Sequence, residues 1–225
     1  MSPTAKPPKL CIFDLDGTLV DSLRDIADAL NECLDLLGLP TRPLEQYRYM
    51  VGEGVPTLCR RAIGDTHPLL VARLAELARA RYRAYPLVHT KPYPGVVELV
   101  GALRRSGVRL GVLSNKPHEL TTRVVRAFWT EDAFEAVQGY VDEQHRKPDP
   151  HYVRAMCEQL GVSPAQTCLV GDTPTDVETA RRAGARCLAI TWGFRTRDDL
   201  LAAGATEIVD RPDEALQALL GQRCA

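Results

Sequence analysis

The sequence of 225 residues lacks the features typical of a membrane protein or a nucleic-acid-binding protein. No apolar run approaches the ~20 residues that a membrane-spanning helix needs. Its 28 Lys and Arg residues are balanced by 29 Asp and Glu residues, for a net charge of −1, whereas a chain that neutralises a phosphate backbone is basic. We therefore expect no membrane and no nucleic acid among its partners. A small anionic ligand fits this balance, because it needs only local positive charge.

Disulfide and zinc-site patterns are also missing. The seven cysteines are odd in number and never spaced as Cys-x-x-Cys, and several lie in apolar runs, where a thiol behaves as a small hydrophobic group. The five histidines form no pair with zinc-ligand spacing. The first ten residues are polar and rich in proline, without the apolar stretch of a secretory signal, and are expected to form a disordered lead-in. These absences indicate core thiols in a reducing cytoplasm.

The composition is that of a globular protein, and the pattern of apolar runs predicts alternating strands and helices. The hydrophobic fraction is 45%, the charged fraction is 25%, and the length allows one large domain or a domain with an insertion. Apolar runs predict strands at residues 10–13, 109–115, 136–141, 167–172, 186–191 and 207–210. Helical patterns separate the later runs. Strands that alternate with helices at this spacing predict a parallel sheet with helices on both faces.

The long segment after the first strand is expected to be helical, and its residues 39–92 contain no convincing strand. Apolar residues at helical spacing predict helices at residues 22–37, 43–50, 55–63 and 68–85. We therefore predict an α/β core domain formed by residues 1–19 and 94–225, with an all-helical cap domain formed by residues 20–93. An insertion at the carboxyl end of a parallel strand stands over the place where such sheets bind ligands, so the cap is expected to act as a lid.

Two aspartates end the first strand. The stretch LCIFDLDGTLVDS carries Asp14 and Asp16 one residue apart, directly after the apolar run. Because like charges repel and burial disfavours ionisation, this pair predicts a cation nearby. Asp172 ends another apolar run in the stretch LVGD, and its carboxylate would converge on Asp14 if the two strands were neighbours. Oxygen ligands of this kind suit Mg²⁺ that retains several waters.

Other polar residues lie at strand ends or in loops of the same α/β order. Ser114, Asn115 and Lys116 end the strand in LSNK, Lys147 lies in RKPDP, and Asp176 follows in GDTPTD. Each has an ordinary alternative: Asn115 as a helix cap, Lys147 as a solvated side chain, and Asp176 as a partner of the helix dipole. Together they supply what a phosphoryl-transfer site needs, since Mg²⁺ and a lysine would offset the clustered carboxylates.

These segments resemble a known family. DLDGTLVDS, LSNK, RKPDP and GDTPTDVETA, in this order, are similar to the four motifs of the haloacid dehalogenase superfamily of phosphohydrolases, and the match extends from Leu10 to about Ile208. The helical insertion and the stretches VGEGVPTLCRRAIG, YPGV and SNKP resemble the phosphoglycolate phosphatase-like branch. The resemblance implies a Rossmann-like parallel sheet core with a small all-helical cap inserted after the first strand. Glu53 departs from the branch pattern, and its role is left open.

The resemblance also implies roles for the acidic residues. Asp14 would be the nucleophile that takes the phosphoryl group as an aspartyl-phosphate. Asp16 would be the general acid for the leaving group and then the base for water. Asp14, Asp172 and the main-chain carbonyl of Asp16 would bind Mg²⁺, and Asp176 would support the metal shell.

For the substrate, the resemblance implies contacts from both domains. Ser114 would donate to the phosphoryl oxygens with Asn115 alongside, and Lys147 would neutralise charge between the phosphoryl group and the nucleophile. In the cap, Arg61 is expected to bind the non-reacting end of a small acidic substrate, and the ordinary alternative for both Arg60 and Arg61 is a solvated helix arginine. The expected reaction is Mg²⁺-dependent hydrolysis of a small phosphorylated metabolite, with 2-phosphoglycolate as the first expected substrate.

Several alternatives stay open at this point. A sugar-phosphate mutase similar to β-phosphoglucomutase, a pyrophosphatase and a nucleotidase would share the core motifs. A dehalogenase of the same fold lacks an acid at the second position of the first motif, and Asp16 argues against it. A non-enzymatic phosphoaspartate signalling module carries its acceptor on a later strand and has no helical insertion. The sequence fixes neither the substrate nor whether the protein is a monomer or a homodimer.

Overall fold

Consecutive apolar residues form the centre of a parallel sheet. All four side chains of β1 are buried, and β1 pairs with β4 on one side and with β6 on the other. A strand covered on both faces reads as a continuous apolar run, which is the pattern seen in the sequence. The sheet order is β5-β4-β1-β6-β7-β8. Its strands are β1 (Leu10–Phe13), β4 (Arg109–Pro117), β5 (Ala136–Tyr140), β6 (Thr167–Gly171), β7 (Arg186–Ile190) and β8 (Ile208–Val209).

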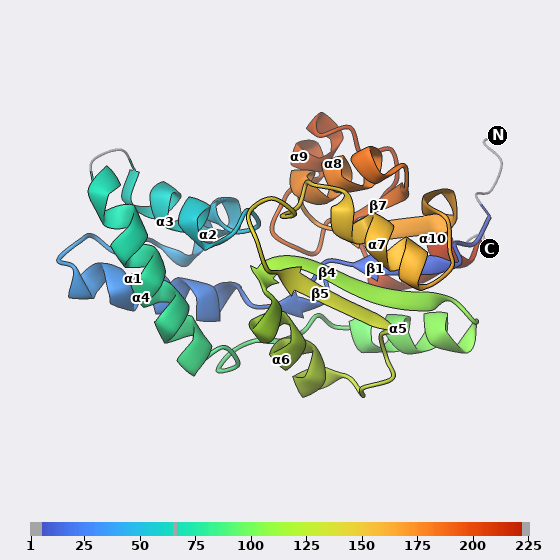
Figure 1. Cartoon of the computed structure of the whole chain (residues 1–225), viewed down its shortest axis with the longest axis horizontal. Coiled ribbons are helices and arrows are strands. Elements are labelled where there is room, and N and C mark those ends of the chain that lie inside the picture. Colours follow the sequence, from blue (N-terminus) through green and yellow to red (C-terminus); the bar gives the residue numbers. More distant parts are fainter. Residues whose placement is uncertain (1–5, 65–66, 222–225) are drawn as a thin grey trace.

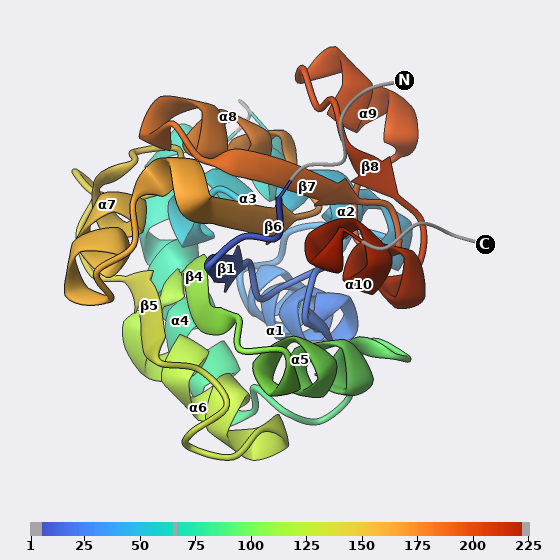
Figure 2. The same ribbon diagram turned by 90° about the vertical axis from the view of Figure 1, so that its right-hand side faces the viewer.

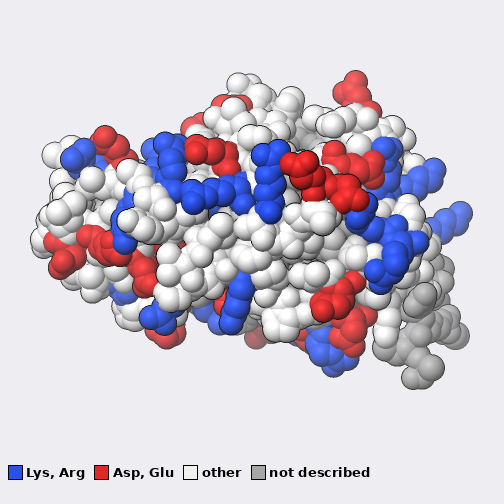
Figure 3. Space-filling model, turned by 90° about the horizontal axis from the view of Figure 1, so that it is seen from below, with Lys and Arg blue, Asp and Glu red and all other residues white. Residues whose placement is uncertain are grey.

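The structure is a computed structural model that describes residues 6–64 and 67–221 (Figure 1). The predictions for residues 1–5 and for Cys224 fall outside the described residues. The predicted α/β class, with a parallel sheet and flanking helices, is confirmed. All six described cysteines carry free thiols, and five of them are buried. Figure 3 shows acidic and basic side chains interspersed over one face of the molecule.

Helices cover both faces of the sheet. Figure 2 shows α5 and α10 on one side and α7 and α8 on the other. Apolar side chains of these helices fill separate core clusters on the two faces of β1. The core helices are α5 (Val96–Arg105), α6 (His118–Phe128), α7 (His151–Gln159), α8 (Pro174–Ala183), α9 (Arg197–Ala202) and α10 (Pro212–Leu220). Among the described residues, no helix is both long enough and apolar enough to cross a bilayer.

Helices α9 and α10 lie outside the helices expected from the sequence, although both begin with recognisable signals. At the start of α9, Thr196 and Asp199 form a capping box. At the start of α10, Pro212 stands in the first turn together with Asp213 and Glu214. Both helices are short, so their apolar periodicity is weak beside these terminal signals.

The segment between β1 and α5 folds as a helical lobe with its own apolar core. The lobe consists of α1 (Leu23–Leu36), α2 (Leu44–Met50), α3 (Val55–Ile63), a 3₁₀ turn (Pro68–Leu70) and α4 (Val71–Ala84). Its buried side chains, with Leu34 and Tyr47 among the largest, form a cluster separate from those of the sheet. The lobe corresponds to the predicted cap, although the exact division at residues 20–93 stays a prediction.

A short antiparallel ribbon joins the cap to the core. Its strands are β2 (Val20–Asp21) and β3 (Lys91–Pro92), which pair where the chain leaves the core and where it returns. The expectation of no strand up to residue 92 is therefore wrong at β3. Two residues are too few to leave a periodic pattern in a sequence.

One buried carboxylate fastens the cap helix α1 to the returning chain. Asp25 is 4% exposed, and it accepts hydrogen bonds from the N–H groups of His89 and Thr90, both at 2.8 Å. It also accepts from the Thr90 hydroxyl at 2.6 Å. Buried donors left without a partner are costly, so this residue stabilises the base of the cap.

Replacing Asp25 with Ala should therefore lower the free energy of unfolding by about 1–3 kcal/mol, because it strands the donors of His89 and Thr90. Urea denaturation measures this change. The control is Asp28→Ala on the same helix, whose exposed carboxylate makes only long surface contacts, with Arg24 at 3.6 Å and the His89 ring at 3.9 Å. An equal loss in both variants would contradict the role assigned to Asp25.

Candidate active site

The carboxyl ends of three neighbouring strands meet beneath the cap. Asp14 follows β1 and Asp172 follows β6, and these strands pair in parallel with Phe13 opposite Val170. The N–H of Asp14 extends this pairing by donating to the carbonyl of Val170 at 2.9 Å. The predicted convergence of the two aspartates is therefore a consequence of the strand order.

A third carboxylate joins them from the start of α8. Oxygens of Asp14, Asp172 and Asp176 lie within 4.8 Å of one another, and all three residues are buried. Asp172 accepts from the Thr18 hydroxyl at 2.9 Å. The backbone at Gly17 passes so close that a Cβ atom there would overlap the Asp172 carboxylate. The glycine of the first motif thus makes room for the second acidic strand end.

A buried ammonium group compensates part of this charge. Lys147 Nζ lies 3.0 Å from Asp14 Oδ1 and 2.7 Å from Asp176 Oδ1, and the side chain is 3% exposed. Burial lowers the pKa of Lys147, but attraction to these two carboxylates outweighs it and raises the pKa above its ordinary value. The alternative of a solvated loop lysine is therefore wrong.

The carboxylates still carry an electrostatic cost. Burial, opposed by Lys147 and reinforced by the neighbouring acids, raises the pKa of Asp14 from an ordinary 3.8 to about 8. Burial and the charge of Asp176 likewise raise the pKa of Asp172 to about 7, although the N–H of Phe194 and the Thr18 hydroxyl oppose the shift. One lysine does not neutralise three carboxylates. The negative charge that remains is what a cation-binding site requires.

Asn115 holds the Lys147 loop against the sheet. Its Oδ1 accepts from the N–H of Lys147 at 2.9 Å, and its Nδ2 donates to the carbonyls of Lys147 at 3.1 Å and Gly52 at 2.9 Å. The alternative of a helix cap is wrong, because α6 begins without a side-chain cap. With its amide occupied, Asn115 is placed to position Lys147, and a direct contact with substrate stays untested.

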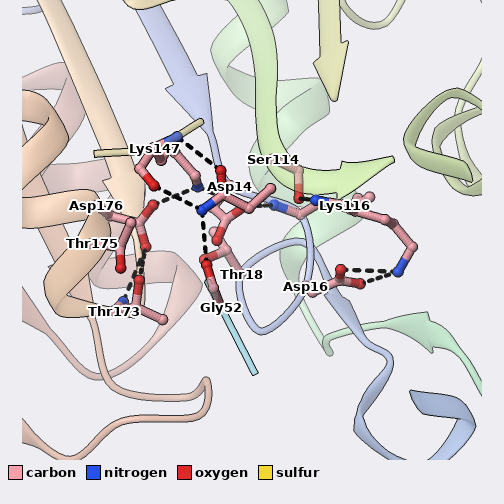
Figure 4. A network of polar contacts seen from close by, with 12 residues as sticks. Asp14, Asp16, Thr18, Gly52, Ser114, Lys116, Lys147, Thr173, Thr175 and Asp176 are labelled. Atoms are coloured by element: carbon pink, nitrogen blue, oxygen red, sulfur yellow. Dashed lines mark hydrogen bonds and ion pairs between the residues drawn. The ribbon is translucent and has the colours of Figure 1, made fainter. Parts of the chain in front are cut away.

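Asp16 points away from this cluster toward Lys116 (Figure 4). Lys116 Nζ donates to both Asp16 oxygens, at 2.7 and 2.9 Å, and to the Tyr82 hydroxyl at 2.7 Å. The Ser22 hydroxyl also donates to Asp16, at 2.6 Å. Sequence reasoning noted the ammonium group of Lys116 but gave it no role, and it missed Tyr82. The only signal was a lysine placed directly after a motif residue.

A cavity separates these groups from the cap. Asp14, Asp16 and Ser114 line it from the core, and Arg79 and Tyr82 line it from α4. The Ser114 hydroxyl oxygen accepts from the N–H of Lys116 at 3.2 Å, which leaves its own proton available to a ligand.

Arg61 does not lie among the residues that line this cavity. Its guanidinium donates to Glu53 at 2.5 Å and to the carbonyl of Met50 at 3.2 Å. The structure therefore gives Glu53 a role, as the partner of Arg61, and offers no support for a substrate contact by Arg61.

A loop of the core also enters the cap. The Phe194 side chain is 2% exposed and belongs to the apolar cluster of the cap, while its N–H donates to Asp172 at 2.7 Å. Arg48 of α2 donates to the carbonyls of Gly193 at 2.6 Å and Phe194 at 3.2 Å. Arg195 donates to the carbonyl of Val51 at 3.1 Å. The acidic cluster and the cap thus share one loop.

This arrangement suits reactions of anionic groups. Transfer of a phosphoryl group depends mainly on positioning and on the charges around its oxygens. Buried carboxylates and a serine hydroxyl at the ends of parallel strands, with a lysine from a nearby loop, supply those elements beneath the cap. Fold and site therefore define a capped α/β enzyme that acts on an anionic ligand.

The chain belongs to the family of haloacid dehalogenase-like hydrolases, whose sequence profile matches residues 8–184. It is 38% identical to the phosphoglycolate phosphatase of Rhodospirillum rubrum over 216 residues, 90% of this chain and 87% of that protein. It is 33% identical to the phosphoglycolate phosphatase of Nitrosospira multiformis, over 95% of this chain and 96% of that one.

Solved structures agree with this assignment. The crystal structure of a predicted phosphoglycolate phosphatase from Haemophilus somnus matches with a TM-score of 0.85 at 27% identity, covering 93% of this chain and 96% of that one. The CbbY protein of Rhodobacter sphaeroides, solved with xylulose-1,5-bisphosphate, matches with a TM-score of 0.75 at 26% identity, covering 92% and 96%. The resemblance seen in the motifs is therefore confirmed at the level of the family.

We expect Lys147→Met to lower the free energy of unfolding of the metal-free protein by about 3–5 kcal/mol at pH 8, because Asp14 and Asp176 would remain buried without their cation. The loss should shrink at pH 6, where the stranded Asp14 carboxyl takes up a proton. Urea denaturation in the presence of a chelator measures both values. Exposed Lys91→Met is the control, with a change within about 0.5 kcal/mol. A loss independent of pH would refute this account.

Proposed function

We propose that the protein is a Mg²⁺-dependent phosphatase that forms an aspartyl-phosphate on Asp14 and hydrolyses 2-phosphoglycolate. The observation that carries the proposal is Asp14 itself, a buried carboxylate on the wall of the cavity with a lysine fixed beside it. The substrate is taken from relatives named phosphoglycolate phosphatase, which are 33–38% identical over most of the chain. A small metabolite as partner and a cytoplasmic location are parts of the same proposal.

The hydrogen bonds of Asp14 leave one oxygen available for attack. Within the described part of the chain, the N–H of Leu15 at 2.7 Å and Lys147 at 3.0 Å both reach Oδ1. Oδ2 would form the bond to phosphorus while the bond from phosphorus to the ester oxygen breaks. Lys147 holds the orientation of the carboxylate and reduces its repulsion from the incoming phosphoryl group.

Asp16 would give a proton to the leaving oxygen and later take one from the water that cleaves the aspartyl-phosphate. In the present arrangement its oxygens accept from Lys116 and Ser22. Acid catalysis therefore requires Asp16 to exchange Lys116 for the leaving oxygen. Lys116 and the Tyr82 hydroxyl act here as positioning groups, since they fix the position of the Asp16 carboxylate before the proton transfer.

The acidic cluster fits a divalent metal. Its donors are carboxylate oxygens within 4.8 Å of one another, and the raised pKa values of Asp14 and Asp172 show that their charges lack full compensation. Asp14, Asp172 and the Asp16 carbonyl would hold Mg²⁺, and Asp176, which also accepts from Thr173, would support them. When bound, Mg²⁺ would screen the charge of the phosphoryl oxygens.

Ser114 completes the phosphoryl site in this proposal. Its hydroxyl lines the cavity and has a proton to donate, whereas the Asn115 amide is occupied by Gly52 and Lys147. None of the reported relatives favours a sugar-phosphate mutase, a pyrophosphatase, a nucleotidase or a signalling module, so these alternatives are not carried further.

Purified protein should release phosphate from 2-phosphoglycolate faster than from a sugar phosphate, a nucleotide or pyrophosphate.

Asp14→Asn should reduce turnover at least about a thousandfold, because it removes the nucleophile and keeps the shape of the side chain. Mass spectrometry of rapidly quenched enzyme should find the phosphoryl group on the peptide that contains Asp14. A phosphoryl group found on a serine or histidine instead would rule out this mechanism.

Added Mg²⁺ should raise the Tm more at pH 8 than at pH 6. At pH 6 the carboxyls of Asp14 and Asp172, with pKa values of about 8 and 7, carry protons that the metal must displace. Without metal, these raised values make folding less favourable as the pH rises from about 4 to about 8. Differential scanning calorimetry measures the shift. Asp172→Asn should remove most of it, and an equal shift at both pH values would contradict the proposed metal site.

A further inference from the structure

Arg79 presents an uncommitted positive charge to the cavity. It lies on α4 and lines the cavity that also contains Asp14 and Asp16. Among the residues that the structure describes, no carboxylate is paired with its guanidinium. A charged group without an internal partner at the wall of a binding cavity is available to a ligand.

The other basic groups near the substrate path are already occupied. An ammonium group has three donors, and those of Lys116 meet both oxygens of Asp16 and the Tyr82 hydroxyl. Further arginines of the cap donate to partners outside the cavity. These are Arg42 to Ala62, Arg48 to Gly193, Arg61 to Glu53, Arg73 to Glu76 and Arg83 to Glu119.

The position of Arg79 on α4 directs it to the same side as Tyr82. Residues three apart on a helix share a face, and Ala78, Arg79 and Tyr82 all line the cavity. Tyr82 reaches Lys116 at 2.7 Å, and Lys116 reaches Asp16, so this face of α4 lies over the reacting groups. Arg79 therefore borders the space that a small ligand held at Asp14 would fill.

We propose that Arg79 is a specificity-determining residue that binds the carboxylate of the substrate while the phosphoryl group lies at Asp14. The inference rests on the proposed phosphoglycolate phosphatase activity. A guanidinium matches a carboxylate through two parallel hydrogen bonds, which an ammonium group cannot make. Arg79 is exposed, and apolar side chains of α1, including Leu30, line the same cavity beside it.

The test compares two substrates with the same carbon skeleton, 2-phosphoglycolate and 2-hydroxyethyl phosphate, which has an alcohol in place of the carboxylate. Arg79→Met should lower kcat/KM for 2-phosphoglycolate at least about tenfold, the effect of losing a charge-assisted hydrogen bond, and change the value for 2-hydroxyethyl phosphate less than about twofold. Arg79→Lys should retain part of the preference. Arg73→Met, on the same helix but paired with Glu76 at 2.8 Å on an exposed face, is the control.

The outcomes separate this inference from the proposed function. If the wild-type protein prefers 2-phosphoglycolate and Arg79→Met keeps that preference, Arg79 does not bind the carboxylate, although the activity stands. An equal loss for both substrates would make Arg79 a structural residue and also overturn the inference. If the wild-type protein shows no preference for the carboxylate, both the substrate and the role of Arg79 are wrong.

Discussion

The acidic site depends on the two ion pairs of one buried ammonium group, that of Lys147. Asp14 and Asp176 are both buried, and without Lys147 between them their charges would oppose folding. Asn115 of β4, the strand that pairs with β1, in turn fixes the loop that carries Lys147. Charge balance at the edge of the sheet therefore depends on a loop that the sheet itself holds. Asp14, Asp172 and Asn115 lie on or directly after three neighbouring strands, and Lys147 reaches Asp14 from a loop.

The cap is bound to this edge through main-chain atoms as well as through the ribbon of β2 and β3. The carbonyl of Gly52 accepts from Asn115, and the carbonyl of Val51 accepts from Arg195. These contacts place the start of α3 against the site, while α4 closes the opposite wall of the cavity with Arg79 and Tyr82. The core thus supplies Asp14, Asp16 and Ser114 to the cavity, and the cap supplies its opposite wall.

The parts of the site that follow from backbone order were predictable from the sequence. Parallel strands end at one edge, so the meeting of Asp14 and Asp172 follows from two apolar runs and their spacing. The partner of Lys116 was not predictable, because Asp16 is separated from it by 100 residues and by the packing of α4. Arg61 and Arg79 show the same limit. Both lie on helices whose patterns are clear, but the face that meets the core is decided by contacts between segments.

Phe194 links the position of the cap to a loop of the core. Its ring is part of the apolar core of the cap, although the loop that carries it follows β7 of the core. Swinging the cap away would return this ring to water at a cost of about 2 kcal/mol. The N–H of Phe194 also donates to Asp172, so the same movement would weaken this hydrogen bond in the acidic cluster. A ligand that fixes the Asp172 carboxylate would therefore also favour the arrangement in which Phe194 lies in the core of the cap.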